Sequence, residues 1–197
     1  MRRGRFALVL LVGVTLPGCG YNRIQALDER TEELQSNIAV ELTNRNQLIP
    51  NIVATVQGAA EFERGTFTDV AQARAGVQQA QQQVAEAVER GDVEQMSVAD
   101  AQLGRQIGTY LNIAVERYPD LRATQNFQAL QDQLAESENR ISVARRDYNE
   151  AVRQHNTYIR QFPQAVTARV VGAGRKEPFQ PPPGVEQPPQ VDFSRPR

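Results

Sequence analysis

The chain has 197 residues, with 22 Lys and Arg against 23 Asp and Glu, one His and one Cys. Residues 19–163 hold 14 of the basic and 20 of the acidic residues, and this acidic excess argues against a nucleic-acid-binding protein, because phosphate backbones are also negative. A single Cys makes a disulfide within the chain impossible. One Cys and one His also leave too few soft ligands for a structural zinc site.

The N-terminus has the pattern of an export signal. Three arginines lie within residues 1–5, and an apolar run follows over residues 6–16. The run is too short to span a bilayer as a helix, which takes about 20 residues, but it suits a signal peptide. We therefore predict a signal peptide over residues 1–18.

The only cysteine, Cys19, directly follows this leader. The sequence Leu16-Pro17-Gly18-Cys19 is similar to a bacterial lipobox, although Pro17 is atypical at its position. We predict cleavage before Cys19 and acylation there with palmitate-type chains, since several chains anchor a protein stably. Gly20 carries no retention signal of the aspartate type, which favours the outer membrane if the host has one. The alternative is an ordinary or uncleaved leader with an incidental cysteine.

The first expected helix covers residues 22–61. Its apolar residues recur at steps of three, four or seven, close to the heptad period of a coiled coil. The spacing continues in phase across Pro50, so we predict one kinked helix, with a brief break of the chain at Pro50 as the alternative.

Three more helices are expected, over residues 66–89, 93–117 and 121–162. Gly91 and Asp92 supply a helix stop and an N-cap between the first two, and Pro119 forces a turn before the last. Two long and two shorter helices joined by tight turns predict an all-α, up-down antiparallel four-helix bundle over residues 19–163.

Residues 164–197 hold seven of the eleven prolines. This composition favours an extended, disordered tail over a packed element. The tail could also serve as a proline-rich ligand for a partner.

Patterns that would indicate catalysis or a cofactor are missing. His155 lacks the Glu-x-x-His and His-Glu-x-x-His spacings of di-iron bundles and metalloproteases, and the glycines form no phosphate-binding loop. A hydrogen-bonded bundle histidine is the simpler interpretation. The carboxylates, including Asp28, Glu29, Glu32 and Glu33, read as a solvated acidic face. No catalytic residue, metal or cofactor is therefore expected.

One polar set stands out on the last long helix. Glu138 and Asn139 interrupt its apolar seam, and Arg145 and Asn149 follow within three turns. Polar groups at a helix seam commonly set register and partner choice. We predict a polar network or interaction site formed by these residues with positions near Pro50 on the first helix, namely Arg45, Asn46 and Asn51.

These segments carry a family resemblance. The chain resembles the LemA family in three segments: residues 44–53, the Tyr118-Pro119-Asp120-Leu121 turn with Asn126, Phe127 and Leu130, and residues 138–149. Residues 188–193 also resemble the family. The resemblance implies a helical up-down bundle attached to a bacterial envelope by its N-terminus and lying outside the cytoplasm. Family members often keep a membrane-spanning N-terminal segment, so the lipobox-like sequence is a departure. The resemblance implies no established enzymatic activity or catalytic residues.

Together these observations predict a non-enzymatic scaffold, held to the membrane by lipid at Cys19, presenting a rod of about 60 Å to an envelope protein partner. Self-association is also possible. One alternative is an accessory subunit of an integral membrane protease or transporter. Another is an envelope enzyme acting on cell-wall polymers, which would need Glu138, Arg145 or His155 to meet solvent in a pocket.

Overall fold

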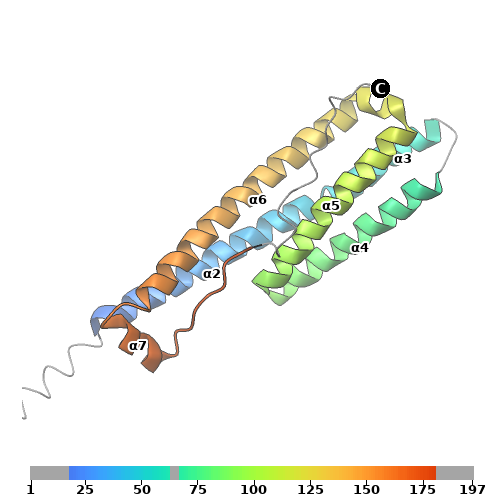
Figure 1. Cartoon of the computed structure of the whole chain (residues 1–197). Helices are drawn as coiled ribbons and strands as arrows, with labels where there is room; N and C mark the ends of the chain where they lie inside the picture. The colour runs from blue at the N-terminus through green and yellow to red at the C-terminus, as the bar shows by residue number, and fades with distance from the viewer. Residues whose placement is uncertain (1–17, 63–66, 181–197) are drawn as a thin grey trace, which may run out of the picture. The chain divides into compact units, whose positions relative to one another are not determined.

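The computed structural model describes residues 18–62 and 67–180, without the side chains of residues 18, 19, 61 and 62. The predicted leader and the last part of the proline-rich segment, residues 181–197, lie outside the described residues. In chain order the elements are α2 (Gly18–Asn46), α3 (Ile49–Phe62), α4 (Thr68–Arg90), α5 (Val93–Arg117), the 3-10 helix η1 (Pro119–Ala123), α6 (Gln125–Tyr158) and α7 (Gln164–Val171) (Figure 1). No strand occurs among the described residues, and the all-α prediction is confirmed.

The described residues form two compact units. The first, here called the terminal unit, combines residues 18–36 with residues 146–178. The second, the central unit, contains residues 37–62 and 67–145, together with Phe179 and Gln180. The two units are described separately below.

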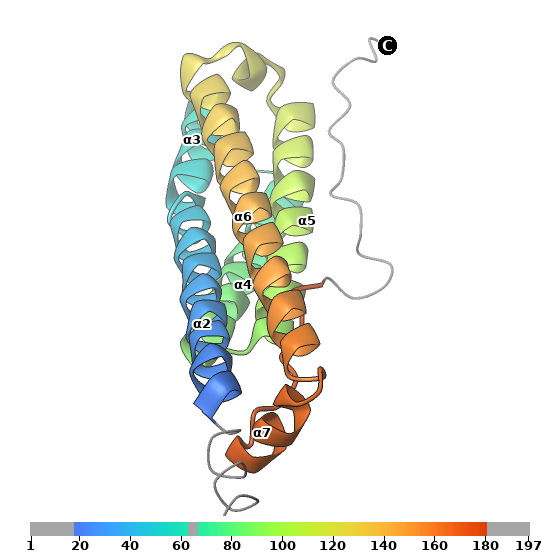
Figure 2. The same cartoon turned by 90° about the vertical axis from the view of Figure 1, so that its left-hand side faces the viewer.

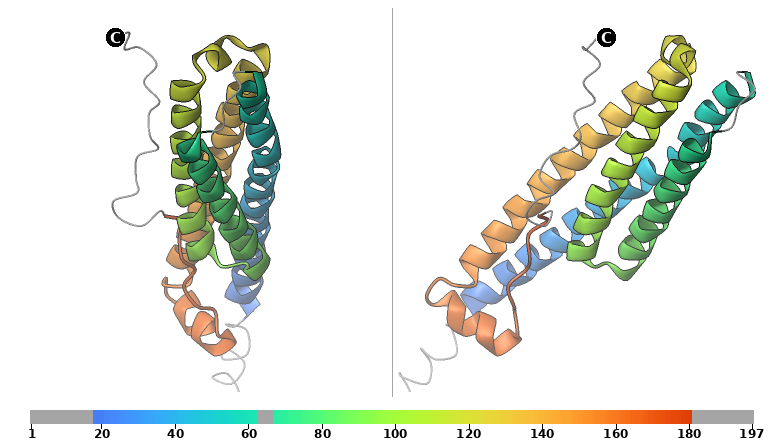
Figure 3. Two further views of the ribbon diagram at one scale, coloured as in Figure 1. Left: turned by 90° about the vertical axis from the view of Figure 1, so that its right-hand side faces the viewer. Right: turned by 45° about the vertical axis from the view of Figure 1, so that its right-hand side comes forward.

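In the central unit, α4 and α5 form a helical hairpin with the predicted connection (Figure 3). Gly91 takes the left-handed conformation at the end of α4, with φ of 65°, where a side chain would be strained. The next residue, Asp92, accepts a hydrogen bond from the backbone N–H of Gln95 at 3.0 Å and so caps α5. The predicted third helix, 93–117, matches α5 at both ends.

The predicted single helix through Pro50 is wrong, because the chain breaks between α2 and α3. Pro50 is the second residue of α3, where its missing N–H is tolerated. The carbonyl of Asn46, which residue 50 would reach in a continuous helix, accepts instead from Gln81 Nε2 at 3.2 Å. In return, Asn46 Nδ2 donates to the carbonyl of Gln81 at 3.0 Å. An exchange between α2 and α4 therefore replaces the backbone hydrogen bond that proline removes.

The apolar seam continues through this break. Leu42, Ile49 and Ile52 are all buried on the two sides of it. Other core positions of the central unit come from α4, α5 and α6: Val77, Ala80, Val84, Met96, Leu103, Tyr110, Ala114, Phe127 and Ile141. The glutamine-rich centre of α4 is regular helix, with Ala80 buried in its middle and Gln78, Gln79 and Gln82 exposed.

The last long helix is shorter than predicted. Residues 119–123 form η1 after Tyr118, whose φ of −126° and ψ of 78° lie outside the helical region, as expected before a proline. Helix α6 then begins at Gln125 instead of 121 and ends at Tyr158 instead of 162.

The terminal unit shows that the extended tail does not begin at residue 164. Helix α7 lies beside the start of α2 (Figure 2), and Ala168 packs with Ile24 and Ile159 in a small core. Sequence analysis missed α7 because proline content was averaged over the whole segment, whereas Gln164–Val171 itself contains no proline. For residues 164–180 the prediction of disorder is therefore corrected.

Candidate functional site

Four charged side chains in the central unit form a cluster in which Arg45 and Asp100 are buried and Glu138 is partly exposed. Arg45 at the end of α2, Asp100 in α5, and Glu138 and Arg145 in α6 form it, and we call it the Arg–Asp cluster. Arg45 Nη1 donates to Asp100 Oδ1 at 2.8 Å, and Arg145 Nη2 contacts Asp100 Oδ2. Arg45 Nη1 also lies 3.1 Å from Glu138 Oε2, and Arg145 Nη1 lies 3.9 Å from Glu138 Oε1. Two guanidinium groups thus share two carboxylates.

Burial makes this cluster unusual. Asp100 is 1 % exposed and Arg45 is 7 % exposed, whereas charged side chains are seldom fully buried unless paired. Burial lowers the pKa of Arg45, although the charge of Glu138 works in the opposite direction. Burial, and secondly the positive charge of Arg45, lower the pKa of Arg145 to about 10. With a pKa of about 10, Arg145 stays protonated at neutral pH and cannot act as a general base there.

Gly104 and Phe179 shape the walls around the arginines. A Cβ atom at Gly104, one turn after Asp100, would lie 3.0 Å from Arg45 Nη2. The Arg145 guanidinium stands over the Phe179 ring, 5.2 Å from its centroid, and Phe179 is 3 % exposed. Next to it, Ser97 Oγ donates to the carbonyl of Gln180 at 2.5 Å. The C-terminal segment therefore covers one side of the cluster.

The structure brings together part of the predicted polar network. Arg45, Glu138 and Arg145 are in contact, and Asn46 pairs with Gln81 as described above. Asn51 and Asn139 are exposed, and Asn149 is half-buried. These three asparagines remain candidate interaction residues.

Sequence analysis missed Asp100, although a signal was present. Asp100 follows Met96 by four residues and precedes Leu103 by three, so it lies on the apolar face of α5. A carboxylate on such a face needs a cationic partner, and Arg45 or Arg145 could have been assigned to it. The predicted polar set came from the first and last helices, whereas Asp100 lies on α5.

A second charged cluster lies in the terminal unit. Lys176 Nζ is 2.7 Å from Asp28 Oδ1 and 3.4 Å from Glu32 Oε1, and Asn156 bonds the Lys176 backbone in both directions. Burial lowers the pKa of Lys176, but its hydrogen bonds and charge interactions with Asp28 and Glu32 outweigh this and raise it. Asp28 and Glu32 therefore do more than form a solvated acidic face.

His155 adjoins this second cluster. It is 1 % exposed, its Nδ1 lies 3.5 Å from Asn156 Oδ1, and its Nε2 lies 3.9 Å from Asp28 Oδ1, beyond hydrogen-bond distance. The expected hydrogen-bonded histidine thus has one long contact, and its Nε2 is buried without a hydrogen-bond partner.

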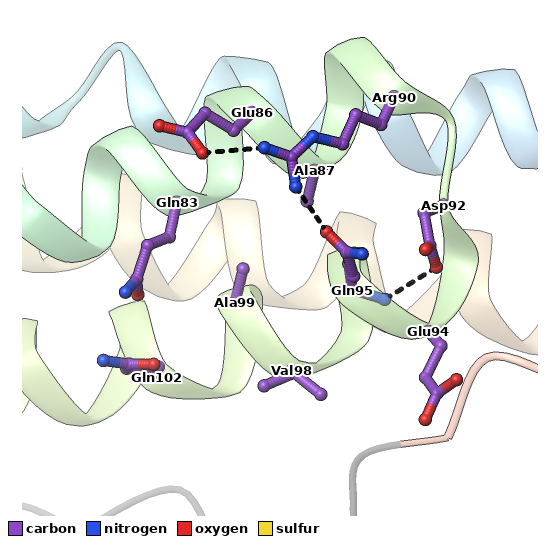
Figure 4. Close-up of a pocket in the computed structure, with 10 residues that line it drawn as sticks. All are labelled: Gln83, Glu86, Ala87, Arg90, Asp92, Glu94, Gln95, Val98, Ala99 and Gln102. Carbon is purple, nitrogen blue, oxygen red and sulfur yellow. Dashed lines mark hydrogen bonds and ion pairs between the residues drawn. The ribbon is translucent and has the colours of Figure 1, made fainter.

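An open groove of about 500 Å³ lies between the end of α4 and the start of α5 (Figure 4). Arg90 projects into it and is already bonded, to Glu86 Oε2 at 3.2 Å and to Gln95 Oε1 at 3.0 Å. The groove lining includes none of Glu138, Arg145 and His155, the groups that the enzyme alternative would need in a pocket.

The described residues contain neither a metal site nor a membrane-spanning helix. Among residues 18–62 and 67–180, no group of three His, Cys, Asp or Glu side chains is placed to hold a metal ion. Within those ranges no helix combines the length and apolar character needed to cross a bilayer.

Comparison with known proteins gives a consistent family. The model of the LemA family matches residues 34–193. A protein named magnetosome protein MamQ 2, from Paramagnetospirillum magneticum (strain AMB-1), is 27 % identical over 184 residues, covering 85 % of this chain and 67 % of the relative. Magnetosome protein MamQ from Magnetospirillum gryphiswaldense (strain MSR-1) is 24 % identical over 211 residues, covering 95 % and 77 %.

Proposed function

The chain belongs to the LemA family, and we propose that it is a membrane-tethered helical scaffold of the bacterial cell envelope. In this proposal the leader is cleaved, Cys19 is acylated, and the helices lie outside the cytoplasm, on the outer membrane if the host has two membranes. The protein acts by holding a partner protein near the membrane and catalyses no reaction.

The observation that best supports the tether is the start of α2. The helix begins at Gly18, Gly20 is already buried, and a Cβ at Gly20 would lie 3.3 Å from Gln164 Cγ of α7. A chain cut before Cys19 would thus begin directly with packed structure. A lipid at Cys19 would then hold the terminal unit against the membrane without an intervening linker.

The pairing of the charges in the Arg–Asp cluster supports a binding role. In the Arg–Asp cluster each charged group already has an oppositely charged partner, and a buried network of this kind specifies how helices pair. We infer that it fixes the register of an up-down antiparallel four-helix bundle built from α2 with α3, α4, α5 and α6. The exposed Asn51 and Asn139 are then available to a partner. The names of the two MamQ relatives assign them to magnetosomes and state no reaction.

Crosslinking in intact cells, followed by mass spectrometry of the attached proteins, tests this proposal. Cys19→Ala serves as the unanchored control. Protein partners that are lost in this control would support a tethered scaffold, and a single dominant partner would identify an accessory subunit. An identical set of crosslinks in the anchored and unanchored proteins would contradict the proposal.

A further inference from the structure

The surface of α7 combines exposed apolar and basic side chains. Phe162, Val166 and Val170 are 86 %, 58 % and 81 % exposed. Arg160, Arg169 and Arg175, also exposed, flank or interleave them. These six residues are called the α7 face.

The two valines of this face share one side of α7, and Phe162 lies just before the helix. Val166 and Val170 are one turn apart, and Arg169 lies beside them, whereas Ala168 on the opposite side is buried against Ile24 and Ile159. Packing within the terminal unit therefore uses the Ala168 side. The side with the valines is left to solvent, although both have large apolar side chains.

The charge of the surrounding residues indicates which partner could cover the valine side of α7. From residue 151 to residue 176 the chain has five cationic residues and no Asp or Glu. One of the five, Lys176, is paired with Asp28 and Glu32, but the three arginines of the α7 face project from an acid-free stretch. A helix with Lys or Arg on its polar border and exposed apolar residues is typical of peptides that lie in the interface of an anionic bilayer.

The position of α7 points to the same partner. Its first residue, Gln164, is the side chain closest to Gly20, and Gly20 directly follows Cys19. Figure 2 shows α7 beside the start of α2, the helix that has Cys19 in its first turn. Tyr21, in the first turns of α2, is also exposed. An acyl chain on Cys19 would bring a bilayer next to the α7 face.

We propose that the α7 face inserts into the headgroup region of an anionic lipid bilayer. This would be a second membrane contact besides the lipid at Cys19. It rests on the proposed function in one respect, because the lipid tether would keep the α7 face close to a bilayer. Two contacts close together would fix the orientation of the terminal unit on the membrane, which a single flexible anchor cannot do.

Because Cys19 is the only cysteine, single cysteines introduced elsewhere can be labelled selectively once Cys19 is acylated. The membrane-extracted protein carrying Val166→Cys or Val170→Cys, labelled with a polarity-sensitive fluorophore, is reconstituted into vesicles containing phosphatidylglycerol or phosphatidylcholine alone. Ser36→Cys is the matched control. It is exposed on α2 in the same unit, about 25 Å along the helix from Gly20.

We expect lipids carrying a quencher in the acyl chain to quench the fluorophores at positions 166 and 170, in anionic vesicles only, and to leave the one at 36 unchanged. Replacing Arg160 and Arg169 by Gln should weaken this contact roughly tenfold or more, since each basic residue near an anionic surface contributes about 1 kcal/mol. The control Arg30→Gln, on an exposed residue paired with Glu33, should not weaken it.

The outcomes separate this inference from the proposed tether. Vesicle-bound protein with unquenched fluorophores at 166 and 170 would overturn the α7 contact and leave the tether standing. If the intact mass shows no acyl chain, the same labels are placed on a Cys19→Ala background; quenching at 166 and 170 in anionic vesicles would then support the α7 contact and overturn the lipid tether. Equal quenching in neutral vesicles would contradict the charge argument. Protection of both positions by a bound protein, without quenching, would assign the face to a protein partner instead.

Discussion

The carboxylate of Asp100 lies 2.8 Å from the guanidinium of Arg45, a residue 55 positions earlier in the chain. This contact joins the end of α2 to the middle of α5. It also places a fully buried anion where two arginines can share it. The stability of the central unit should therefore depend strongly on Asp100.

Asp100→Ala should destabilise the central unit by about 3–5 kcal/mol, because removing one partner of a buried ion pair leaves the other charges unpaired. Urea unfolding followed by circular dichroism measures the loss. The matched control is Asp69→Ala, which removes an exposed carboxylate that pairs with Arg117, and it should change the midpoint little. Equal effects of the two substitutions would show that burial of the Arg–Asp cluster is not important.

Gly104→Ala should destabilise the protein by about 1–3 kcal/mol, since the added methyl group would displace the Arg45 guanidinium from its paired position. Gly58→Ala in α3 is the control, because a Cβ there meets no atom within 4 Å. It should stabilise the helix by about 0.5–1 kcal/mol. Opposite signs of the two changes in thermal midpoint are the expected result.

Gln81→Ala should cost about 1–2 kcal/mol, because it leaves the Asn46 carbonyl at the helix break without its donor. Gln82→Ala is the same substitution at the next, exposed position and should be neutral within about 0.5 kcal/mol. Denaturant unfolding of both variants compares them. If the two variants unfold alike, the exchange between Asn46 and Gln81 does not replace the hydrogen bond lost at Pro50.

Only some of the features behind these three predictions could be predicted from the sequence. Helix α5 could be predicted at both ends because Asp92 before it and Pro119 after it are local signals that do not depend on the rest of the fold. The break before Pro50 was only the alternative to a kinked helix, because the apolar seam runs through it unchanged. The hydrogen bonds between Asn46 and Gln81, a residue on another helix, are what we expect to favour the break.

The candidate site, too, could be predicted from the sequence only in part. Glu138 and Arg145 could be predicted because Glu138 interrupts a seam and Arg145 follows it by two turns, and Arg45 could be predicted because it lies near Pro50 on the first helix. Asp100 completes the cluster from α5, and Phe179 covers it from the segment expected to be a tail. Such long-range contacts depend on which faces meet, and periodicity within one helix does not contain that information.

Phe179→Ala should destabilise the central unit by about 3 kcal/mol and expose the C-terminal segment, because it removes a buried ring that contacts Arg145. Limited proteolysis combined with mass spectrometry should then detect faster cleavage near Gln180. Phe162→Ala, at an exposed phenylalanine, should leave both stability and cleavage unchanged. Unaltered cleavage in the Phe179 variant would contradict the packing of this segment on the cluster.

Two of the five tyrosines should titrate abnormally late. Burial raises the pKa of Tyr110 and of Tyr148 to about 12, and Tyr148 also donates to the Glu177 carbonyl at 2.9 Å. The folded state keeps these protons while the unfolded state loses them near pH 10, so stability should fall between about pH 10 and pH 12. Absorbance at the tyrosinate band during a pH titration measures this, and Tyr148→Phe should remove one late-titrating group. Ionisation of all five tyrosines near pH 10 would be the contrary result.

The intact mass of the protein extracted from membranes tests the central claim of a lipid tether most directly. We predict a chain that begins at Cys19 and carries the added mass of acyl groups, and we expect no acyl mass on Cys19→Ala. A membrane-bound chain that still begins at Met1, or an unmodified chain recovered in the soluble fraction, would contradict the tether at Cys19.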